Sequence, residues 1–165
     1  MRNAAGRSFA PDAENALLFV SVPPEDLAGP ELLDPESPLG AIAARVVLQV
    51  SDRARLAETL APTVTADLRG RGYRLAVDEL GAGQASLAAI ALLLPEFVKI
   101  DATLVHGVHA SDVRKRLVEA MVRAARELAC EIVADGVEAP EDRDALLAIG
   151  CEVQQGPLFA DPLSP

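Results

Sequence analysis

Six short apolar segments of this chain are each followed by polar or charged side chains that could do chemistry. These side chains are Ser21, Gln49, Asp78 with Glu79, Lys99, Asp135 with Glu138, and Gln155. Hard cations such as Mg²⁺ require oxygen ligands of this kind, mostly carboxylates in near-octahedral arrangement. Because these residues are spread along most of the chain, they can share a site only if the fold brings the ends of the apolar segments together.

The apolar segments are predicted to be strands, and the stretches between them are predicted to be helices. The expected strands are residues 16–22, 45–50, 73–77, 97–100, 131–134 and 151–155. The expected helices are residues 53–69, 84–94, 111–129 and the segment that begins at Pro140 and ends before Gly150. Gly81, Ala82 and Gly83 are too few for a phosphate-binding loop and are expected to form a turn. Since strand and helix alternate, the sheet should be parallel with right-handed crossovers.

Residues 111–129 give the clearest helical pattern of the chain. Ser111 is a good N-cap, because its hydroxyl can accept a hydrogen bond from the first free backbone N–H groups. The apolar positions at helical spacing are Val113, Leu117, Met121, Ala124 and Leu128. A stripe of this kind is usually the buried face of a helix. We therefore expect it to pack on the sheet.

This pattern predicts an α/β fold, namely an incomplete TIM-like (β/α) barrel with about six parallel strands. In such a barrel the C-terminal strand ends open onto one face, where catalytic groups lie. A closed barrel of this type has eight strands, so residues 17–22 and 151–155 become apolar edges beside a gap. Unpaired edges recruit other chains or must be covered. A protein partner or second copy could fill the gap, residues 1–15 and the C-terminal tail could cover it, or the sheet could flatten.

The candidate residues also have plainer interpretations. Asp78 and Glu79 could be a solvated strand end, since loops are rich in acids. Lys99 is expected to pair with a neighbouring acid rather than to be poised for chemistry. His106 and His109 stand three residues apart, but the nearby acids do not form a ligand set for a metal.

Composition narrows the class of protein. The chain has 165 residues, of which 50% are hydrophobic, and its formal net charge is −10. This charge disfavours binding to DNA, RNA or anionic membranes, because phosphate groups are bound by clustered Lys and Arg. No apolar run reaches the length of a membrane span, and no signal peptide opens the chain, so a cytoplasmic protein is expected. Cys130 and Cys151 are expected to be reduced, buried thiols.

Four segments in order carry a family resemblance. Residues 75–83 (LAVDELGAG), 98–101 (VKID), 133–138 (VADGVE) and 155–159 (QGPLF) are similar to the family motifs ALDDFGTG, LKID, VAEGVE and QGYLF. The family is that of EAL domains, which are cyclic di-GMP phosphodiesterases on a β/α barrel. The likeness predicts a truncated EAL-like domain over residues 16–165, preceded by an N-terminal extension or linker at residues 1–15. The first two strands of the EAL barrel have no counterpart in this prediction.

The resemblance implies roles for the candidate residues. Active members use two divalent metals to activate a water that attacks the phosphodiester. Asp78, Glu79 and Asp135 match metal-binding positions, and Lys99 matches the lysine at the nucleophilic water. Glu138 matches a retained acid of the catalytic centre. The implied vestigial catalytic residues are thus Lys99 and Glu138, and the implied ligand-binding residues are Asp78, Glu79, Lys99 and Gln155.

Departures from the family pattern predict a loss of catalysis. Ser21 replaces an asparagine ligand, Gln49 replaces a glutamate ligand, and Asp135 replaces a glutamate with a shorter arm. The glutamate of the EAL signature and the arginine that follows it are absent. Each lost metal ligand should cost several kcal/mol of transition-state stabilisation, at about 1.4 kcal/mol for every tenfold in rate.

We therefore interpret the chain as a degenerate, non-catalytic EAL domain that serves as a regulatory or protein-interaction module in cyclic di-GMP-type signalling. One alternative is a sensor that binds cyclic di-GMP without hydrolysing it. Another is a weak Mg²⁺-dependent phosphodiesterase. No cofactor is expected for the main interpretation, and Mg²⁺ or Mn²⁺ would be needed only where activity is retained. The expected partner is a protein or a second copy at the open barrel edge.

Overall fold

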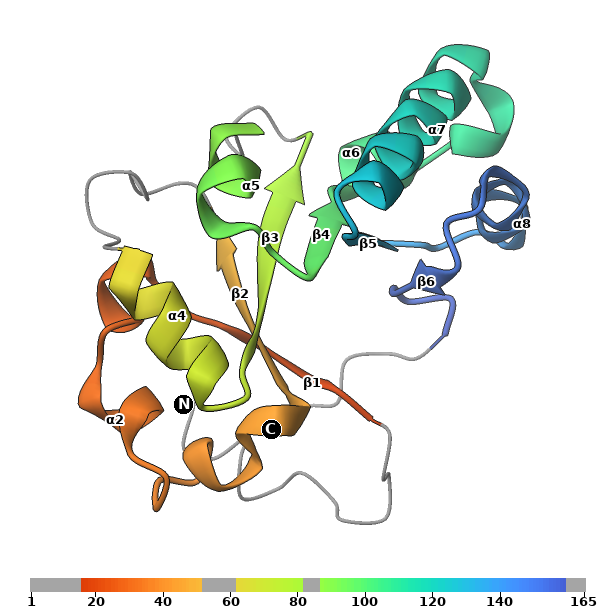
Figure 1. Ribbon diagram of the computed structural model, residues 1–165. Coiled ribbons are helices and arrows are strands. Elements are labelled where there is room, and N and C mark those ends of the chain that lie inside the picture. The colour runs from red at the N-terminus through yellow and green to blue at the C-terminus, as the bar shows by residue number, and fades with distance from the viewer. Residues whose placement is uncertain (1–15, 52–61, 82–86, 160–165) are drawn as a thin grey trace.

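The computed structural model describes residues 16–51, 62–81 and 87–159, which form one six-stranded parallel sheet with packed helices (Figure 1). The strands are β1 (Leu18–Ser21), β2 (Val46–Ser51), β3 (Arg74–Leu80), β4 (Phe97–Ile100), β5 (Glu131–Ala134) and β6 (Val153–Gln154). Their order in the sheet is their order in the chain, and every neighbouring pair is parallel. The predicted α/β fold, an incomplete β/α barrel with about six parallel strands, is thereby confirmed.

Helical segments connect the strands. They are η1 (Pro24–Asp26), α2 (Pro30–Leu33), η2 (Gly40–Arg45), α4 (Pro62–Gly70), α5 (Leu87–Leu93), α6 (Ala102–Val105), η3 (Val108–Ala110), α7 (Asp112–Glu127) and α8 (Pro140–Ile149). Sequence patterns did not predict α6 and η3, because each is shorter than two helical turns and shows no periodicity. Within the described ranges, no helix combines the length and apolar character that a bilayer crossing requires.

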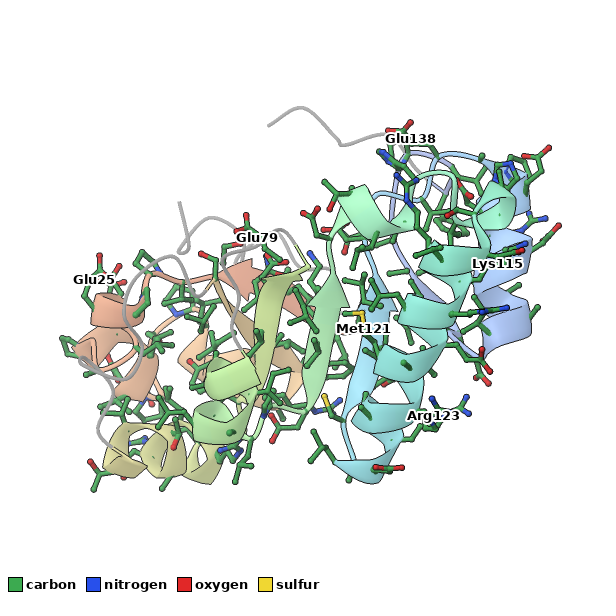
Figure 2. The ribbon with its side chains drawn as sticks, turned by 90° about the horizontal axis from the view of Figure 1, so that it is seen from above. Glu25, Glu79, Lys115, Met121, Arg123 and Glu138 are labelled. Atoms are coloured by element: carbon green, nitrogen blue, oxygen red, sulfur yellow. The ribbon has the colours of Figure 1, made fainter. Side chains whose placement is uncertain are left out.

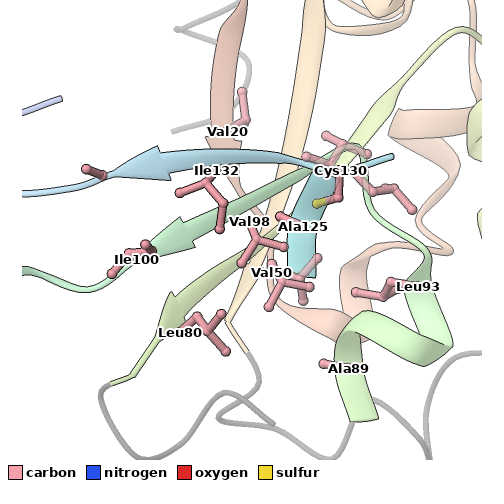
Figure 3. Packing of buried hydrophobic residues seen from close by; sticks show 14 of the residues in the cluster. Val20, Val50, Leu80, Ala89, Leu93, Val98, Ile100, Ala125, Cys130 and Ile132 are labelled. Carbon is pink, nitrogen blue, oxygen red and sulfur yellow. The ribbon is translucent and has the colours of Figure 1, made fainter. Parts of the chain in front are cut away.

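The outer face of the sheet carries the main hydrophobic core (Figure 3). Side chains that alternate along the strands, such as Val50 and Val98, meet helix residues such as Leu93 and Ala125 in one buried cluster. Each is at most 6% exposed. Burial of a Val or Leu side chain is worth about 1.5–3 kcal/mol, so this layer fixes the helices on the outside of the sheet.

A smaller core lies on the inner face and is formed by strand residues alone. Val47, Ala76, Phe97 and Val133 are buried there, and Phe19 packs against them. The rings of Phe19 (β1) and Phe97 (β4) meet edge to face with centroids 5.4 Å apart. Strands β1 and β4 are three positions apart, which in a flat sheet is about 14 Å. The sheet is therefore strongly curled, and its C-terminal strand ends converge.

The observed strands agree closely with the predicted ones, with one informative difference. β4 has the predicted bounds, but β3 continues past Val77 to Leu80, so Asp78 and Glu79 lie inside the strand rather than after it. The pairing of β3 with β4 shifts register between Val77 and Leu80. Such a bulge turns the local backbone and re-aims the side chains next to it, which alternation alone does not predict.

The predicted packing of the 111–129 helix was wrong. Ser111 caps α7 as predicted, since its Oγ accepts a hydrogen bond from the backbone N–H of Arg114. However, Val118, Val122 and Ala125 are the buried residues of α7. The predicted stripe is largely exposed, with Val113 at 78%, Leu117 at 45% and Leu128 at 62%. The apolar arc of this helix is wider than the sheet can cover, and the sheet meets one flank of it.

Two further predictions fall partly outside the described residues. The helix expected at 53–69 is described only as α4 from Pro62, and the helix expected at 84–94 only as α5 from Leu87. The turn at Gly81–Gly83 is described at Gly81 alone, which has φ of +103°. A Cβ at Gly81 would lie 2.3 Å from Leu104 Cδ1, so both the backbone angle and the space favour glycine.

Candidate functional site

A continuous polar chain crosses the C-terminal ends of the first three strands. Ser21 ends β1, and parallel pairing sets it beside Gln49 of β2. The Gln49 amide nitrogen donates hydrogen bonds to Ser21 Oγ at 2.6 Å and to Asp78 Oδ2 of β3 at 3.1 Å. The register therefore brings three sequence-predicted residues into direct contact.

Lys99 of β4 lies at the centre of the site. Its side chain is 4% exposed, and its Nζ lies 2.9 Å from Asp135 Oδ2 and 3.6 Å from Asp78 Oδ1. The pairing of Lys99 with neighbouring acids is thus confirmed. A buried ammonium group needs compensating charge, and these two carboxylates supply it. We call Lys99, Asp78 and Asp135 the charge triad.

Glu79 follows Asp78 in an unusual backbone conformation. Its φ is +59°, and its backbone N–H donates a 2.8 Å hydrogen bond to Asp78 Oδ1. A non-glycine residue in the left-handed region costs about 1–2 kcal/mol. The surrounding structure holds Glu79 in this conformation, and the bond helps to fix the Asp78 carboxylate that faces Lys99. This strain was not visible in the sequence.

The remaining predicted residues lie on the same rim but make other contacts. Figure 2 shows Glu79 and Glu138 along one side of the molecule. Glu138 is mostly exposed, and its Oε1 lies 3.4 Å from His106 Nε2. Gln155 is exposed, while its backbone N–H bonds to Ala134 and its carbonyl accepts from Val137. The structure thus gathers Ser21, Gln49 and the charge triad, and it places Glu138 and Gln155 at the margin.

Two hollows open at these strand ends. One, of about 460 Å³, is lined in part by Ser21, Gln49, Asp78 and Glu79. The other, of about 520 Å³, is lined in part by Asp135 and Gln155. The charge triad contributes one carboxylate to each hollow. Gln49 Oε1 is buried, and no hydrogen-bond partner for it exists among the described residues. A bound polar group could satisfy this acceptor.

The described residues do not fit a two-metal centre. They contain no group of three or more His, Cys, Asp or Glu side chains placed to hold a metal ion. Asp78 and Asp135 both face the Lys99 ammonium, and Gln49 brings a neutral amide where a carboxylate would be needed.

A second group of titratable residues was missed by sequence reasoning. The buried carboxylate of Asp142 accepts hydrogen bonds from the backbone N–H groups of Gly107 and His109 and contacts His109 Nδ1 at 2.6 Å. Burial alone would raise the pKa of Asp142, but these hydrogen bonds outweigh it and lower the pKa. His106 instead contacts the Gly136 carbonyl at 2.8 Å. The two histidines therefore have separate structural partners. No local sequence pattern predicts the contact of His109 with Asp142, because the two residues are 33 positions apart.

Comparison with known proteins gives a consistent family. A model of the EAL domain matches residues 4–162 of the chain. The blue light- and temperature-regulated antirepressor BluF of Escherichia coli (strain K12) is 34% identical over 93 residues, which are 56% of this chain and 23% of that protein. The cyclic di-GMP phosphodiesterase NbdA of Pseudomonas aeruginosa is 34% identical over 96 residues, 58% of this chain and 12% of that protein. The chain spans less than a quarter of either relative.

Solved structures agree on the fold. Klebsiella pneumoniae BlrP1, in a calcium and cyclic di-GMP complex, matches with a TM-score of 0.77 and 26% identity over 96% of this chain and 41% of that chain. The EAL domain of Mycobacterium smegmatis DcpA matches with a TM-score of 0.82 over 98% of this chain and 75% of that chain. At 24% identity, the second match bears on the fold alone.

Proposed function

Because this chain belongs to the EAL domain family, we propose that it is a non-catalytic EAL domain that acts as a regulatory or protein-interaction module in cyclic di-GMP signalling. The observation that carries the proposal is the neutral side-chain amide of Gln49, which donates hydrogen bonds to Ser21 Oγ at 2.6 Å and to Asp78 Oδ2 at 3.1 Å. At this position the resemblance implies a charged glutamate ligand, and the amide instead occupies one oxygen of Asp78.

Physical chemistry supports the loss of hydrolysis. Two-metal catalysis requires enough oxygen ligands to hold both ions and to stabilise the attacking and leaving oxygens. Gln49 is neutral, and its amide nitrogen is already directed at Ser21 and Asp78. Ser21 has a shorter side chain than the family's asparagine. Weakening several metal contacts at once lowers the rate multiplicatively, at about tenfold for each 1.4 kcal/mol.

A regulatory role also has support among the relatives. BluF is named as an antirepressor, whereas NbdA is named as a phosphodiesterase, so proteins similar to this chain carry both kinds of role. The strands β1 and β6 each have one neighbour in the described sheet. Unpaired strand edges are sites at which another chain can add. A protein partner or second copy at this edge, and action in the cytoplasm, belong to the same proposal.

A second candidate function is the binding of cyclic di-GMP without hydrolysis. Two hollows at the strand ends and the unpartnered Gln49 Oε1 favour it over a plain interaction module. BlrP1, which resembles this chain in structure, forms a cyclic di-GMP complex. In such binding the charge triad would form a rigid polar surface that contacts the ligand, and Mg²⁺ or Mn²⁺ would not be required. A metal would be needed only for retained hydrolysis.

Calorimetric titration of cyclic di-GMP into the chain, with Mg²⁺ and again with a chelator, tests these proposals together with a hydrolysis assay. The main proposal predicts no turnover and no heat in either condition. Equal binding in both conditions would support the sensor. Turnover that a chelator abolishes would overturn the non-catalytic assignment. Gln49→Leu removes the amide at similar volume and should weaken any genuine binding, whereas Arg143→Gln on α8 is the matched control, because Arg143 lines neither hollow.

A further inference from the structure

A third hollow, of about 530 Å³, opens at the N-terminal ends of the strands, and the proposed function does not use it. It is lined in part by Arg74, the first residue of β3, and Glu131, the first residue of β5. None of its lining residues lines the two hollows at the C-terminal strand ends. Its volume is within the range of sites that bind small molecules. We call it the N-terminal hollow.

The base of the N-terminal hollow is apolar. It is formed in part by Phe97, Val122, Cys130 and Ile132, each of which is at most 7% exposed. Phe97 belongs to the inner core, and the other three belong to the main core. An apolar group placed in this hollow would be removed from water against side chains that the fold already holds in position, which favours its binding.

Arg126, in the last turn of α7, places a fixed cation in the wall of this hollow. Its Nη2 donates a hydrogen bond to the carbonyl of Gly150 at 3.1 Å. A Cβ at Gly150 would lie 2.4 Å from this nitrogen, so the glycine gives the guanidinium group its space. A guanidinium group has five N–H donors, and this bond occupies one of them. The remaining donors suit an anionic group, such as a carboxylate, which can accept two parallel hydrogen bonds.

Carboxylates of the same hollow provide the opposite charge. Glu131 begins β5, and Glu152 directly precedes β6, the neighbouring strand. Among the described residues, neither carboxylate has a hydrogen-bond or ion-pair partner. Burial raises the pKa of the Cys130 thiol to about 11, and the charges of Glu96 and Glu131 contribute to this rise. This part of the hollow is therefore negative and favours a cationic group, such as an ammonium.

The charges of the two signs do not neutralise each other. Arg74 and Glu131 belong to strands that β4 separates, which are about 10 Å apart. Within the part of the chain that the structure describes, neither Arg74 nor Arg126 pairs with a carboxylate of the hollow. A ligand with one charge would meet a like charge there, whereas a zwitterion can pair with both signs. We infer that the N-terminal hollow binds a small zwitterion with an apolar body, namely an amino acid or a short peptide. Its carboxylate contacts Arg126 and its ammonium group contacts Glu131.

NMR titration of the ¹⁵N-labelled full chain with leucine and with leucyl-leucine tests the inference. N-acetylleucine, which lacks the ammonium group, and 3-methylbutylamine, which lacks the carboxylate, are the matched probes. At least one zwitterion should shift the amide signals of the N-terminal hollow saturably and bind at least about tenfold more tightly than either matched probe. Binding of leucine would identify a free amino acid as the ligand, and binding of leucyl-leucine alone would identify a short peptide. No saturable shift at millimolar concentration, or equal binding of a matched probe, would overturn the inference.

Variants test the two charged contacts one at a time. Arg126→Gln and Glu131→Gln should each weaken binding of the zwitterion at least about tenfold. Arg123→Gln and Glu127→Gln are the matched controls, because both residues are exposed on α7 and line no part of the hollow. Figure 2 shows Arg123 on the opposite side of the molecule from Glu79 and Glu138.

Circular dichroism verifies that each variant is folded. Native affinity in both Arg126→Gln and Glu131→Gln would refute the assigned contacts. Because this hollow shares no lining residue with the other two, the result is independent of whether the chain binds cyclic di-GMP.

Discussion

Lys99 is the residue on which the candidate site most depends. Its ammonium group is almost fully buried between Asp78 and Asp135, so removal leaves two carboxylates near each other without their cation. Removing one partner of a buried ion pair typically lowers the free energy of unfolding by about 3–5 kcal/mol. The loss should be smaller here, because both carboxylates are partly exposed. We expect Lys99→Met to lower the free energy of unfolding by about 2–3 kcal/mol, as measured by urea denaturation.

The matched control for this substitution is Lys115→Met. Lys115 forms an exposed pair with Asp112 at 4.0 Å, and such pairs contribute little. Lys115→Met should therefore change the free energy of unfolding by no more than about 0.5 kcal/mol. Adding Asp78→Asn and Asp135→Asn to Lys99→Met should recover part of the lost stability, because the uncompensated charges disappear. A Lys99→Met variant as stable as the native chain would refute the charge triad.

Asp142 gives a prediction about acid stability. Its pKa is lowered in the folded chain because hydrogen bonds from His109 and Gly107 outweigh the effect of burial. An acid whose folded pKa is depressed stabilises the fold above its unfolded pKa, and this contribution is lost as pH falls through the folded value. Native protein and Asp142→Asn should therefore differ most above the ordinary pKa of 3.8 and should converge as pH falls through the lowered pKa of the folded chain. Thermal denaturation over a pH series measures this, and a constant difference would contradict it.

At the residue scale, sequence patterns identified the members of the site but not their partners. The pairing of Lys99 with acids was predictable, because a lysine inside an apolar strand needs a counter-charge. The contact between His109 and Asp142 joins positions 33 apart and depends on how η3 meets α8. The left-handed conformation of Glu79 depends on the register shift in β3. Tertiary geometry of this kind leaves no local signal.

At the scale of elements, glycines fix the loops that lead away from the site. Gly136 follows β5 with φ of +78°, and a Cβ there would lie 2.6 Å from Ala102 Cβ. Gly136→Ala should therefore destabilise the fold by more than about 1 kcal/mol, from backbone strain alone. Gly70 at the end of α4 has no atom within 4 Å of such a Cβ, so Gly70→Ala is the matched control and should be neutral or slightly stabilising. The melting temperatures of the two variants, each compared with that of the native chain, test this prediction.

It was easier to predict where helices and strands form than to predict which face of a helix is buried. β2 and β4 are nearly continuous apolar runs, which is typical of parallel strands buried on both faces. For α7 the apolar positions were found, but periodicity does not say which part of a wide apolar arc the sheet will cover. The buried flank with Val118 and Val122 and the exposed flank with Val113 and Leu117 both belong to that arc. Only the packing of α7 on β5 separates them.

At the scale of the whole molecule, the parallel order of the strands explains how distant residues share one site, because each polar contact from Ser21 to Asp135 joins neighbouring strands. Phe19 and Phe97 meet across the inner face, which requires a curled sheet. The alternation of strand and helix predicted a parallel sheet with this polarity. The contact between the two rings was not predictable, because it depends on the degree of curl rather than on the order of the strands.

The labelling rates of the two cysteines can measure how readily the sheet opens around each buried thiol. Both thiols are free and buried, and burial raises the pKa of each to about 11. Only the thiolate reacts, so at pH 8 about one thiol in a thousand is reactive even where reagent has access. We expect labelling of the native chain to be slow and to accelerate in denaturant. Fast stoichiometric labelling of both thiols in native buffer would contradict their burial.

Comparison of the two thiols then locates the weaker part of the sheet. Cys151 is 1% exposed and Cys130 is 7% exposed, so burial alone predicts that Cys130 reacts first. However, Cys151 precedes β6, a two-residue strand that has a neighbour on one side only in the described sheet, and short edge strands open at low free-energy cost. We therefore expect Cys151 to be labelled first, as read by mass spectrometry of digested protein. A partner that adds to the β6 edge should slow the labelling of Cys151 more than that of Cys130.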